Sequence, residues 1–514
     1  MGNQDELDRS VEVLIVGGGP VGLTARALLE RWGVSVLLVE KRTELSPFPR
    51  SRLVNTRSME IYRQLGLAGP IAARGFPPEF GRVRFRDTLY DPDFGTAAMV
   101  GINAPIPESP VIGVLTSQDR LEPTLLAAAQ APARFGVELV DLAEESESVL
   151  ASLVDHERGE RFRVRARYVL AADGANSTIR HQLGIGTTGP GVLGAFTTVV
   201  FDADLARWSA DQPAGVYFTT HGSFAPLYPE SGWAWFTLTP ENPADADWSG
   251  LLARALGPGA DVKAEVLRVQ HWQMSAFVAD HFSHGRILLA GDAAHAVPPI
   301  GGLGMNAGIG DVHNLCWKLA GVLRGWAGPK LLDTYEAERH PVAHQVFHQA
   351  IANAQLMRDA LTRRLAQGVA PAEVELPWSE RYFAQLGLVL GVSYHSAAVL
   401  GNGSGPPAPS DISTDYVPTA EPGHRMPHVW LGENRSTLDT FGEWFTLLTP
   451  DPARWEQDAT ASPLRIETLP REDADHYGLG TQGALLVRPD GYIGARWDDH
   501  ASLADALTTI VSRA

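Results

Sequence analysis

The segment VEVLIVGGGPVGLTARALLERWGVSVLLVEKR, at 11–42, constrains the fold more than any other part of the chain. Its two apolar runs, glycine-rich turn and helical stretch predict a strand, a helix and a second strand. Gly17, Gly19 and Gly22 have the G-x-G-x-x-G spacing, and Glu40 ends the second predicted strand. The glycines allow a tight turn, close approach of a pyrophosphate and close helix packing, while the acid can accept ribose hydroxyls. The sequence therefore predicts a Rossmann-like α/β unit for NAD or FAD.

Composition narrows the class of protein. With 514 residues, 44% apolar and 20% charged, the chain is expected to fold as a soluble protein of two or three domains. Its net charge of −18 disfavours a nucleic-acid partner. The single cysteine, Cys316, excludes internal disulfides and thiolate-rich metal sites, and we expect it to be buried and no metal to be bound. Without a signal-peptide pattern or an apolar span, we expect a cytoplasmic protein with no membrane partner.

Two later stretches also place an acid directly after a predicted strand. RYVLAADGANSTIR, at 167–180, contains Asp173, and GRILLAGDAAHAVPPIGGLGMNAGIGD, at 285–311, contains Asp292. Together with the glycine turn they resemble the three fingerprints of the class A flavoprotein monooxygenases, the family of p-hydroxybenzoate and phenol hydroxylases. The resemblance covers roughly residues 11–345 and implies the p-hydroxybenzoate hydroxylase fold, with non-covalently bound FAD in the predicted nucleotide site.

The resemblance implies specific flavin contacts. Asp292 would bind the ribityl hydroxyls, and the backbone of residues 304–306 would line the pyrimidine edge of the flavin, where amides at a helix N-terminus stabilise negative charge. We expect Asp311 to cap the helix that follows. The complete set of expected FAD contacts is Gly17, Gly19, Val21, Gly22, Glu40, Lys41, Arg50, Gln118, Asp173, Asp292, Pro299, Gly304, Met305 and Asn306.

Two further segments support the resemblance. SPFPRSRLVNTRSMEIYRQLGL, at 46–67, is similar to the family's Pro-Arg segment behind the flavin, in which Arg50 would contact the flavin or the pyridine nucleotide. LTSQDRLEPTLLAAA, at 115–129, is similar to its Q-x-x-x-E-x-x-L helix start, where Gln118 would reach the ribityl or isoalloxazine side. One departure is Ser51-Arg52, where related chains have small residues, so the contacts beside Arg50 need not follow the family's pattern.

Short β-branched and aromatic runs between the second and third fingerprints predict an antiparallel sheet over residues 187–282, joined by part of 75–115. In the family such a sheet covers the flavin and forms the substrate pocket. WAWF, at 233–236, begins like the W-x-W-x-I-P motif of flavin halogenases, but the Ile-Pro is absent. Because side chains alternate along a strand, each pocket candidate is equally a core candidate. These candidates are Phe218, Phe224, Tyr228, Trp233 and Trp235.

The last part of the chain changes character again. Residues 402–423 have the composition of a linker, and the remainder resembles the thioredoxin-like C-terminal domain of the phenol hydroxylase branch. This part has no cysteine, so we expect a structural or homodimer-contact role and no redox catalysis there. The predicted domains are FAD-binding for 1–75, 116–186 and 283–400, substrate-binding β-sheet for 76–115 and 187–282, and thioredoxin-like for 401–514.

Within the family the chain most resembles the aromatic polyketide hydroxylases, such as aklavinone hydroxylase. The resemblance implies a monooxygenase that consumes NADPH or NADH and O2 and hydroxylates a polycyclic phenol or quinone through a flavin C4a-hydroperoxide. Baeyer–Villiger oxidation and epoxidation on the same fold stay open, as does a flavin-binding protein without turnover. An NAD-dependent dehydrogenase would not need the second and third fingerprints. The sequence identifies no catalytic base, and His295 can have either a packing role or a flavin-proximal role.

We predict that Asp292→Ala abolishes FAD binding, because the variant lacks the carboxylate expected to hold the ribityl chain. The visible flavin absorbance of the purified protein measures this directly. A variant that purifies yellow with unchanged FAD affinity would contradict the assignment.

Overall fold

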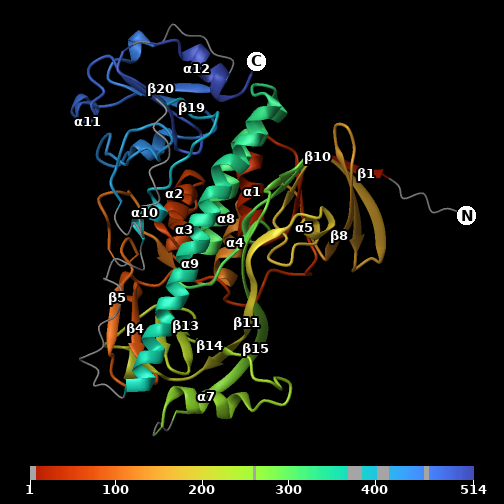
Figure 1. Ribbon diagram of the computed structural model, residues 1–514, viewed down its shortest axis with the longest axis vertical. Coiled ribbons are helices and arrows are strands. Elements are labelled where there is room, and N and C mark those ends of the chain that lie inside the picture. Colours follow the sequence, from red (N-terminus) through yellow and green to blue (C-terminus); the bar gives the residue numbers. More distant parts are fainter. Residues whose placement is uncertain are drawn as a thin grey trace, which may run out of the picture.

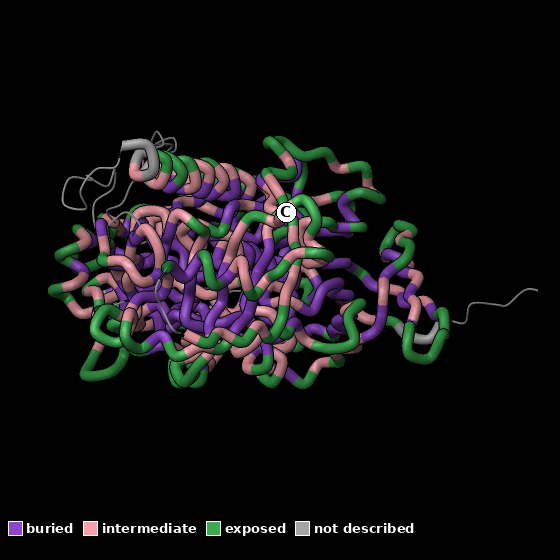
Figure 2. Tube along the Cα trace, turned by 90° about the horizontal axis from the view of Figure 1, so that it is seen from below, coloured by how far each residue is buried: buried purple, intermediate pink, exposed green. Residues whose placement is uncertain are grey.

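The computed structural model describes residues 7–102, 104–258, 262–367, 385–401, 416–455, 462–499 and 501–513. The C-terminal segment forms one end of the molecule, and α7 (Trp248–Leu256) lies at the opposite end (Figure 1). Buried residues fill the interior, while exposed residues follow the outer loops (Figure 2). Of the expected linker at 402–423, residues 402–415 lie outside the described residues.

The first sheet contains the predicted nucleotide-binding unit. Its main path runs β16-β17-β10-β1-β2-β7, and β17, β10, β1, β2 and β7 pair in parallel. An antiparallel extension is formed by β8 and β9, of which β9 pairs with β10. The strands are β1 (Leu7–Val16), β2 (Val36–Glu40), β7 (Ala133–Phe135), β8 (Val137–Glu144), β9 (Val149–Asp155), β10 (Glu160–Ala171), β16 (Ser283–His284) and β17 (Ile287–Leu289).

The second sheet lies in the part of the molecule that ends at α7 (Figure 1). Its order is β18-β15-β11-β14-β13-β12-β4-β5, and every neighbouring pair is antiparallel except β12 with β4. The strands are β4 (Arg82–Arg86), β5 (Gly95–Ala98), β11 (Thr187–Asp202), β12 (Val216–Thr219), β13 (Gly222–Pro226), β14 (Trp233–Leu238), β15 (Glu265–Ala279) and β18 (His295–Ala296). The short aromatic runs of the sequence supply β11 to β14.

The C-terminal sheet has the order β20-β19-β21-β22, with β19 and β20 parallel and the other pairs antiparallel. Its core continues into the first part of the chain, because Trp317 and Trp326 pack with Phe445 and Leu447. The strands are β19 (Phe445–Thr449), β20 (Leu464–Thr468), β21 (Ala484–Val487) and β22 (Ile493–Trp497). A separate pair is formed by β3 (Leu53–Val54) and β6 (Val114–Leu115).

Two helices connect these parts. Helix α8 (Leu303–Arg324) packs against α1 (Pro20–Arg31), and α9 (Asp333–Gln367) runs from the C-terminal sheet to the second sheet (Figure 1). At 35 residues α9 is about 52 Å long, enough to extend from the C-terminal sheet to the second sheet. The remaining α-helices are α2 (Thr56–Gln64), α3 (Ala68–Ala72), α4 (Gln118–Ala127), α5 (Thr178–Gln182), α6 (Ala206–Ser209), α10 (Leu386–Val389), α11 (Arg471–His476) and α12 (Leu503–Ile510).

The expected capping role of Asp311 is wrong. Helix α8 begins at Leu303, after Gly302 in the left-handed conformation, so Asp311 lies inside the helix and is fully buried. Gly308 in this helix allows α8 to pack closely against the glycine turn, since a Cβ there would lie 2.6 Å from Val21 and 2.8 Å from Gly291. Cys316 is buried as expected. In the described part of the chain no helix is long and apolar enough to cross a bilayer, and no His, Cys, Asp or Glu cluster could hold a metal.

We predict that Gly22→Ala destabilises the protein by about 2 kcal/mol or more, because the new Cβ would lie 2.0 Å from the Gly17 carbonyl oxygen. Gly69→Ala is a matched control in α3, where a Cβ meets nothing within 4 Å, and it should be neutral or slightly stabilising. Thermal unfolding of the two variants measures the difference. Equal melting temperatures would contradict the packing argument.

Candidate active site

The three fingerprints meet at the carboxyl ends of neighbouring parallel strands. Gly17 N donates to Val39 O at 2.8 Å, Ala172 N to Val16 O at 2.8 Å, and Ala290 N to Ala171 O at 2.9 Å. These bonds continue the pairing of β2, β1, β10 and β17 beyond their last residues. The turns after these strands therefore leave the same edge of the sheet, which is where α/β folds bind ligands.

The three glycines of the first turn have different surroundings. Gly17 has a φ of +115°, and a Cβ there would lie 2.1 Å from Ala172 O. A Cβ on Gly22 would lie 2.0 Å from Gly17 O, whereas one on Gly19 would meet nothing within 4 Å. Gly17 and Gly22 thus allow the backbones to pack, while Gly19 leaves free space at the start of α1.

That free space belongs to a cavity of about 960 Å³. The cavity begins at the glycine turn, passes the ends of the parallel strands and continues to the second sheet. Twelve of the fourteen expected FAD contacts line it: Gly17, Gly19, Val21, Glu40, Lys41, Arg50, Gln118, Asp173, Asp292, Pro299, Gly304 and Met305. The two others are Gly22, which packs against Gly17, and Asn306.

Asn306 lies beside the cavity and ties two loops together. Its Nδ2 donates to Leu53 O at 2.9 Å and to Gly302 O at 2.6 Å. Its Oδ1 accepts from Asn55 N at 2.9 Å. The side chain therefore fixes the start of α8 against the segment that follows Arg50.

Glu40 and Asp292 present their carboxylates in different ways. Glu40 accepts from Gly18 N at 2.7 Å and from Arg42 N at 2.9 Å, so it helps to shape the turn. Asp292 is exposed to the cavity, and no described residue donates a hydrogen bond to it. Burial raises the pKa of Asp292, and the charges of His295 and Arg50 partly oppose this.

Arg180 joins the second fingerprint to the third. It donates from Nη1 to Ala293 O at 2.9 Å and from Nη2 to Ala175 O at 2.9 Å. Asp173 accepts from Ile179 N at 3.2 Å through Oδ2, while its buried Oδ1 has no partner among the described residues. These bonds hold the turn after β10 in place. They leave Oδ1 of Asp173, which lines the cavity, without a partner in the described part of the chain.

The Pro-Arg segment is fixed by the start of α4. Gln118 accepts from Ser51 N at 3.3 Å and donates to Glu122 at 2.7 Å, and Glu122 accepts from Ser46 N at 3.2 Å. Burial raises the pKa of Glu122 and lowers that of Arg50. Glu122 was not among the expected site residues, although the Q-x-x-x-E spacing could have found it.

Arg52 bonds to the second sheet. Its guanidinium donates to Gly215 O at 2.6 Å and also to Pro226 O, and it lies 5.7 Å from the centre of the Phe76 ring. Burial lowers the pKa of Arg52 to about 10, and Asp119 opposes this shift. The departure from the family's small residue thus adds a connection between the nucleotide-binding part and the sheet.

The start of α8 forms another wall of the cavity. Gly301 and Gly302 have φ values of +98° and +65°, which turn the chain so that Leu303, Gly304 and Met305 in the first helical turn line the cavity. The first backbone amides of a helix have no partner within it, and they carry the positive end of the helix dipole. This wall is suited to a group that bears negative charge.

Two of the five aromatic candidates line the cavity, namely Phe218 and Trp235. Phe224 and Trp233 lie in the core behind the sheet, where Trp235 also packs with its ring stacked on that of Phe224. Tyr228 does not line the cavity: it donates to Asp119 and lies under Arg120, and burial raises its pKa to about 12. Further apolar lining residues that the sequence did not single out include Met99, Phe196, Phe236, Trp272, Met274, Met357 and Leu361.

Residues 10–350 match the family model described as FAD binding domain, and residues 419–514 match the one described as aromatic-ring hydroxylase, C-terminal. Aklavinone 12-hydroxylase from Streptomyces purpurascens is 35% identical, over 98% of this chain and 98% of its own length. The chain belongs to the FAD-dependent aromatic hydroxylases. The expected family is confirmed, and the protein is an FAD-dependent monooxygenase.

Solved structures of related hydroxylases agree. The flavin-dependent monooxygenase PieE, in complex with FAD and substrate, has a TM-score of 0.89 at 31% identity, covering 99% of this chain and 100% of its own. A ternary complex of aklavinone-11 hydroxylase with FAD and aklavinone has a TM-score of 0.83 at 33% identity, with 99% and 100% coverage. The protein therefore has the fold of this hydroxylase family.

The cavity of this hydroxylase fits FAD. Gly19 leaves room where a side chain would fill the space, and Asp292 offers acceptors that no described residue uses. One oxygen of Asp173 is also without a partner in the described part of the chain, and buried polar atoms are normally paired. The amides at the start of α8 complete a set of donors and acceptors that suits the hydroxyl groups and polar edge of the cofactor.

His295 and Asp311 support this site from behind. Asp311 accepts from Gly291 N at 3.0 Å and from Arg339 Nε at 2.8 Å, and it lies 2.7 Å from His295 Nε2. Although burial alone would raise it, the charges and hydrogen bonds of His295 and Arg339 hold the pKa of Asp311 at about 2. His295 does not line the cavity, and it acts through Asp311, which bonds to the turn that carries Asp292.

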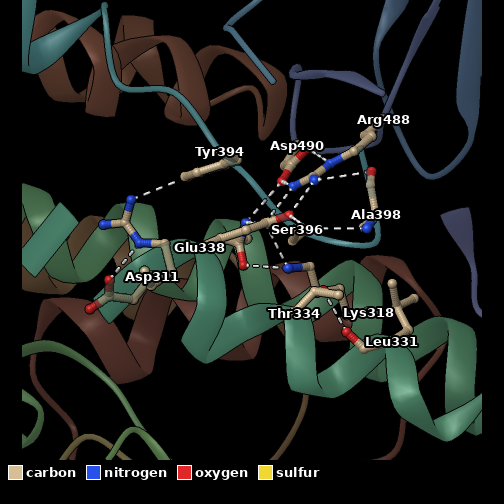
Figure 3. Close-up of polar contacts among 12 residues, drawn as sticks. Asp311, Lys318, Leu331, Thr334, Glu338, Tyr394, Ser396, Ala398, Arg488 and Asp490 are labelled. Carbon is tan, nitrogen blue, oxygen red and sulfur yellow. Dashed lines mark hydrogen bonds and ion pairs between the residues drawn. The ribbon is translucent and has the colours of Figure 1, made fainter. Parts of the chain in front are cut away.

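A buried ion network ties α8 and α9 to the C-terminal sheet (Figure 3). Glu338 on α9 accepts from Lys318 at 2.8 Å, from Ser396 at 2.6 Å and from Arg488 at 2.6 and 2.8 Å. Arg488 also donates to Asp490, and neighbouring Arg339 donates to Tyr394 at 3.1 Å. Buried charges thus fix α8 at two places: Asp311 bonds to Arg339, and Lys318 bonds to Glu338.

We predict that Arg488→Met destabilises the protein by about 3–5 kcal/mol, because Glu338 and Asp490 would keep buried charges without their main partner. Arg435→Met removes the exposed pair with Glu467 and should cost less than about 1 kcal/mol. Denaturant unfolding of both variants compares the two costs. A small effect of Arg488→Met would show that the network does not hold the C-terminal sheet.

Proposed function

We propose that this monooxygenase hydroxylates a polycyclic aromatic phenol or quinone of the polyketide type, with non-covalent FAD as cofactor and NADPH or NADH and O2 as co-substrates. The observation that carries the proposal is the single cavity that joins the glycine turn to the aromatic face of the second sheet. A flat substrate in the outer part would lie next to a flavin in the inner part. The names of aklavinone 12-hydroxylase and of the aklavinone complex support this class of substrate.

In this proposal the nucleotide half of FAD lies along the first turn. The free space at Gly19 and the amides at the start of α1 receive the pyrophosphate, as helix N-termini commonly do. Glu40, at the end of β2, has lone pairs left for the ribose hydroxyls, and Lys41 follows it along the wall. Gly17 and Gly22 act through the packing of the turn.

The flavin half lies along the third fingerprint. Asp292 accepts from the ribityl hydroxyls, and the amides of Gly304 and Met305 meet the polar pyrimidine edge. Arg50 and Gln118 approach from the Pro-Arg side, Asp173 from the end of β10, and Val21 and Pro299 form apolar parts of the wall. Asn306 acts indirectly, by fixing the start of α8.

When bound, FAD supplies the redox chemistry, taking electrons from the nicotinamide cofactor and activating O2 for transfer of one oxygen atom to the substrate. The chain contributes position, a dry site and stabilising dipoles. Phe218, Phe236 and Trp272 provide an apolar wall for a flat ring, and the α8 amides favour negative charge on the polar side.

We assign the three parts of the chain to separate roles. Residues 1–75, 116–186 and 283–400 form the FAD-binding domain, and 76–115 with 187–282 form the substrate-binding domain. Residues 401–514 form a thioredoxin-like domain without cysteine, which the mixed sheet β19 to β22 with α11 and α12 supports. Its buried network with α8 and α9 suggests that it stabilises the flavin site from outside.

The proposal predicts incorporation of one oxygen atom from O2 into a polycyclic phenol. The purified holoenzyme is incubated with aklavinone or a related polycyclic phenol, NADPH and heavy-isotope O2, and the products are weighed by mass spectrometry. Labelled water with ordinary O2 is the control and should leave the inserted oxygen unlabelled. Unlabelled product with labelled O2, or NADPH oxidation that no such phenol accelerates, would contradict the proposal.

A further inference from the structure

The turn at 299–302, which precedes α8, is held by a side chain of α9, Asn353. All four residues of the turn line the cavity, whereas Asn353 is buried and does not line it. Asn353 Nδ2 donates to Ile300 O at 3.2 Å. Met357 and Leu361, one and two helical turns further along α9, line the cavity themselves. Asn353 therefore connects this helix to a wall of the cavity through one backbone carbonyl.

Neighbouring amides fix the orientation of the Asn353 side chain. Its Oδ1 accepts from Gln349 Nε2 at 2.8 Å and from Gln385 Nε2 at 3.4 Å. Because these donors occupy both lone pairs of Oδ1, Nδ2 is the atom that faces the turn. A Cβ on Gly301 would lie 2.8 Å from this Nδ2, so the amide also packs directly against the turn.

The backbone of the turn contains one peptide that can adopt two orientations. Gly302 N donates to Pro299 O at 3.1 Å, which closes a β-turn with Ile300 and Gly301 at its centre. Gly301 has a φ of +98°, as the third residue of a type II turn does, whereas a type I turn has a negative φ there. The two types differ by a flip of the central peptide. The bond from Asn353 to the Ile300 carbonyl therefore selects one of them.

This orientation also directs the amide of Gly301. The peptide is trans, so its N–H points opposite to the Ile300 carbonyl and hence away from Asn353. Gly301 lines the cavity, and its N–H has no acceptor in the described part of the chain. A fixed, unpaired donor on a cavity wall suits an oxygen atom that gains negative charge.

We propose that Asn353 is a positioning residue, which holds the Ile300–Gly301 peptide so that the Gly301 N–H donates to an oxygen atom in the cavity during oxygen transfer. A flipped peptide would present the Ile300 carbonyl to the cavity instead, and a carbonyl oxygen repels developing negative charge. This inference rests on the proposed function, because it concerns the oxygen-transfer step and uses a polycyclic phenol as the probe.

Two variants of similar size separate the donor from the packing of the side chain. Asn353→Leu removes the donor at every pH. Asn353→Asp keeps the shape, and its carboxyl group can donate to Ile300 O only when it is protonated, a form that burial favours by raising the pKa. Gln355→Leu is the control, since Gln355 is exposed on α9 and does not line the cavity.

The coupling of NADPH oxidation to hydroxylation measures the effect on the reaction. The holoenzymes are incubated with aklavinone, NADPH and O2 from mildly acidic to mildly alkaline pH, and hydroxylated product and hydrogen peroxide are quantified per NADPH oxidised. We expect Asn353→Leu to lower the product fraction by about tenfold at every pH, with the remaining electrons recovered as hydrogen peroxide. Asn353→Asp should match the wild type at acidic pH and approach Asn353→Leu as the pH rises. Gln355→Leu should match the wild type throughout.

Crystal structures of the wild-type and Asn353→Leu holoenzymes test the positioning without any substrate. We expect the Ile300 carbonyl to turn toward the cavity in the variant, with a negative φ at Gly301. Should Asn353→Leu not fold, structures of Asn353→Asp at acidic and alkaline pH make the same comparison.

The outcomes separate this inference from the proposed function. A peptide that keeps its orientation without the Asn353 donor overturns the inference, and so does a flipped peptide with unchanged coupling. An Asn353→Asp variant that follows Asn353→Leu at every pH overturns it as well. If the wild type hydroxylates neither aklavinone nor a related phenol but the peptide flips in the variant, the substrate class is wrong and the positioning role stands.

Discussion

The parallel pairing of β2, β1, β10 and β17 is the constraint on which the site depends. The turns that follow β1, β10 and β17 lie far apart in the sequence. Parallel strands end at one edge of a sheet, however, so the fold brings the three fingerprints together. The pairing requires close backbone contact, because a Cβ on Gly17 would lie 2.1 Å from the residue that follows β10. The same glycine that shapes the nucleotide turn thus also fixes its distance from the second fingerprint.

Helix α8 carries this arrangement into the rest of the molecule. Its first turn lines the cavity, Asp311 in its interior holds the turn of Asp292 through Gly291, and Lys318 further along joins the buried network of Glu338 and Arg488. Buried charges of this kind are costly unless each has partners. The C-terminal sheet is therefore connected to the cavity wall at the start of α8 by buried interactions, and the loss of any one of them would destabilise the protein.

Sequence patterns predicted the parts of the site that depend on local spacing. Gly19 and Asp292 follow strands at fixed offsets and Glu40 ends one, and the fold brings them to one cavity. Spacing failed where burial decides the role: Asp311 was expected to cap a helix but lies buried inside one. The aromatic candidates show the same limit, since Phe218 faces the cavity whereas Phe224 lies in the core of the same sheet.

By itself the sequence determined the family, the nucleotide-binding unit and the positions of the turns, because these follow from glycine spacing, strand patterns and acids at strand ends. Only the tertiary structure decided which side chains share the cavity. Met357 and Leu361 on α9 reach it from an element that no local pattern connects to the three fingerprints. The physical reason is that a pocket wall is set by how helices and sheets pack, and packing joins residues that are distant along the chain.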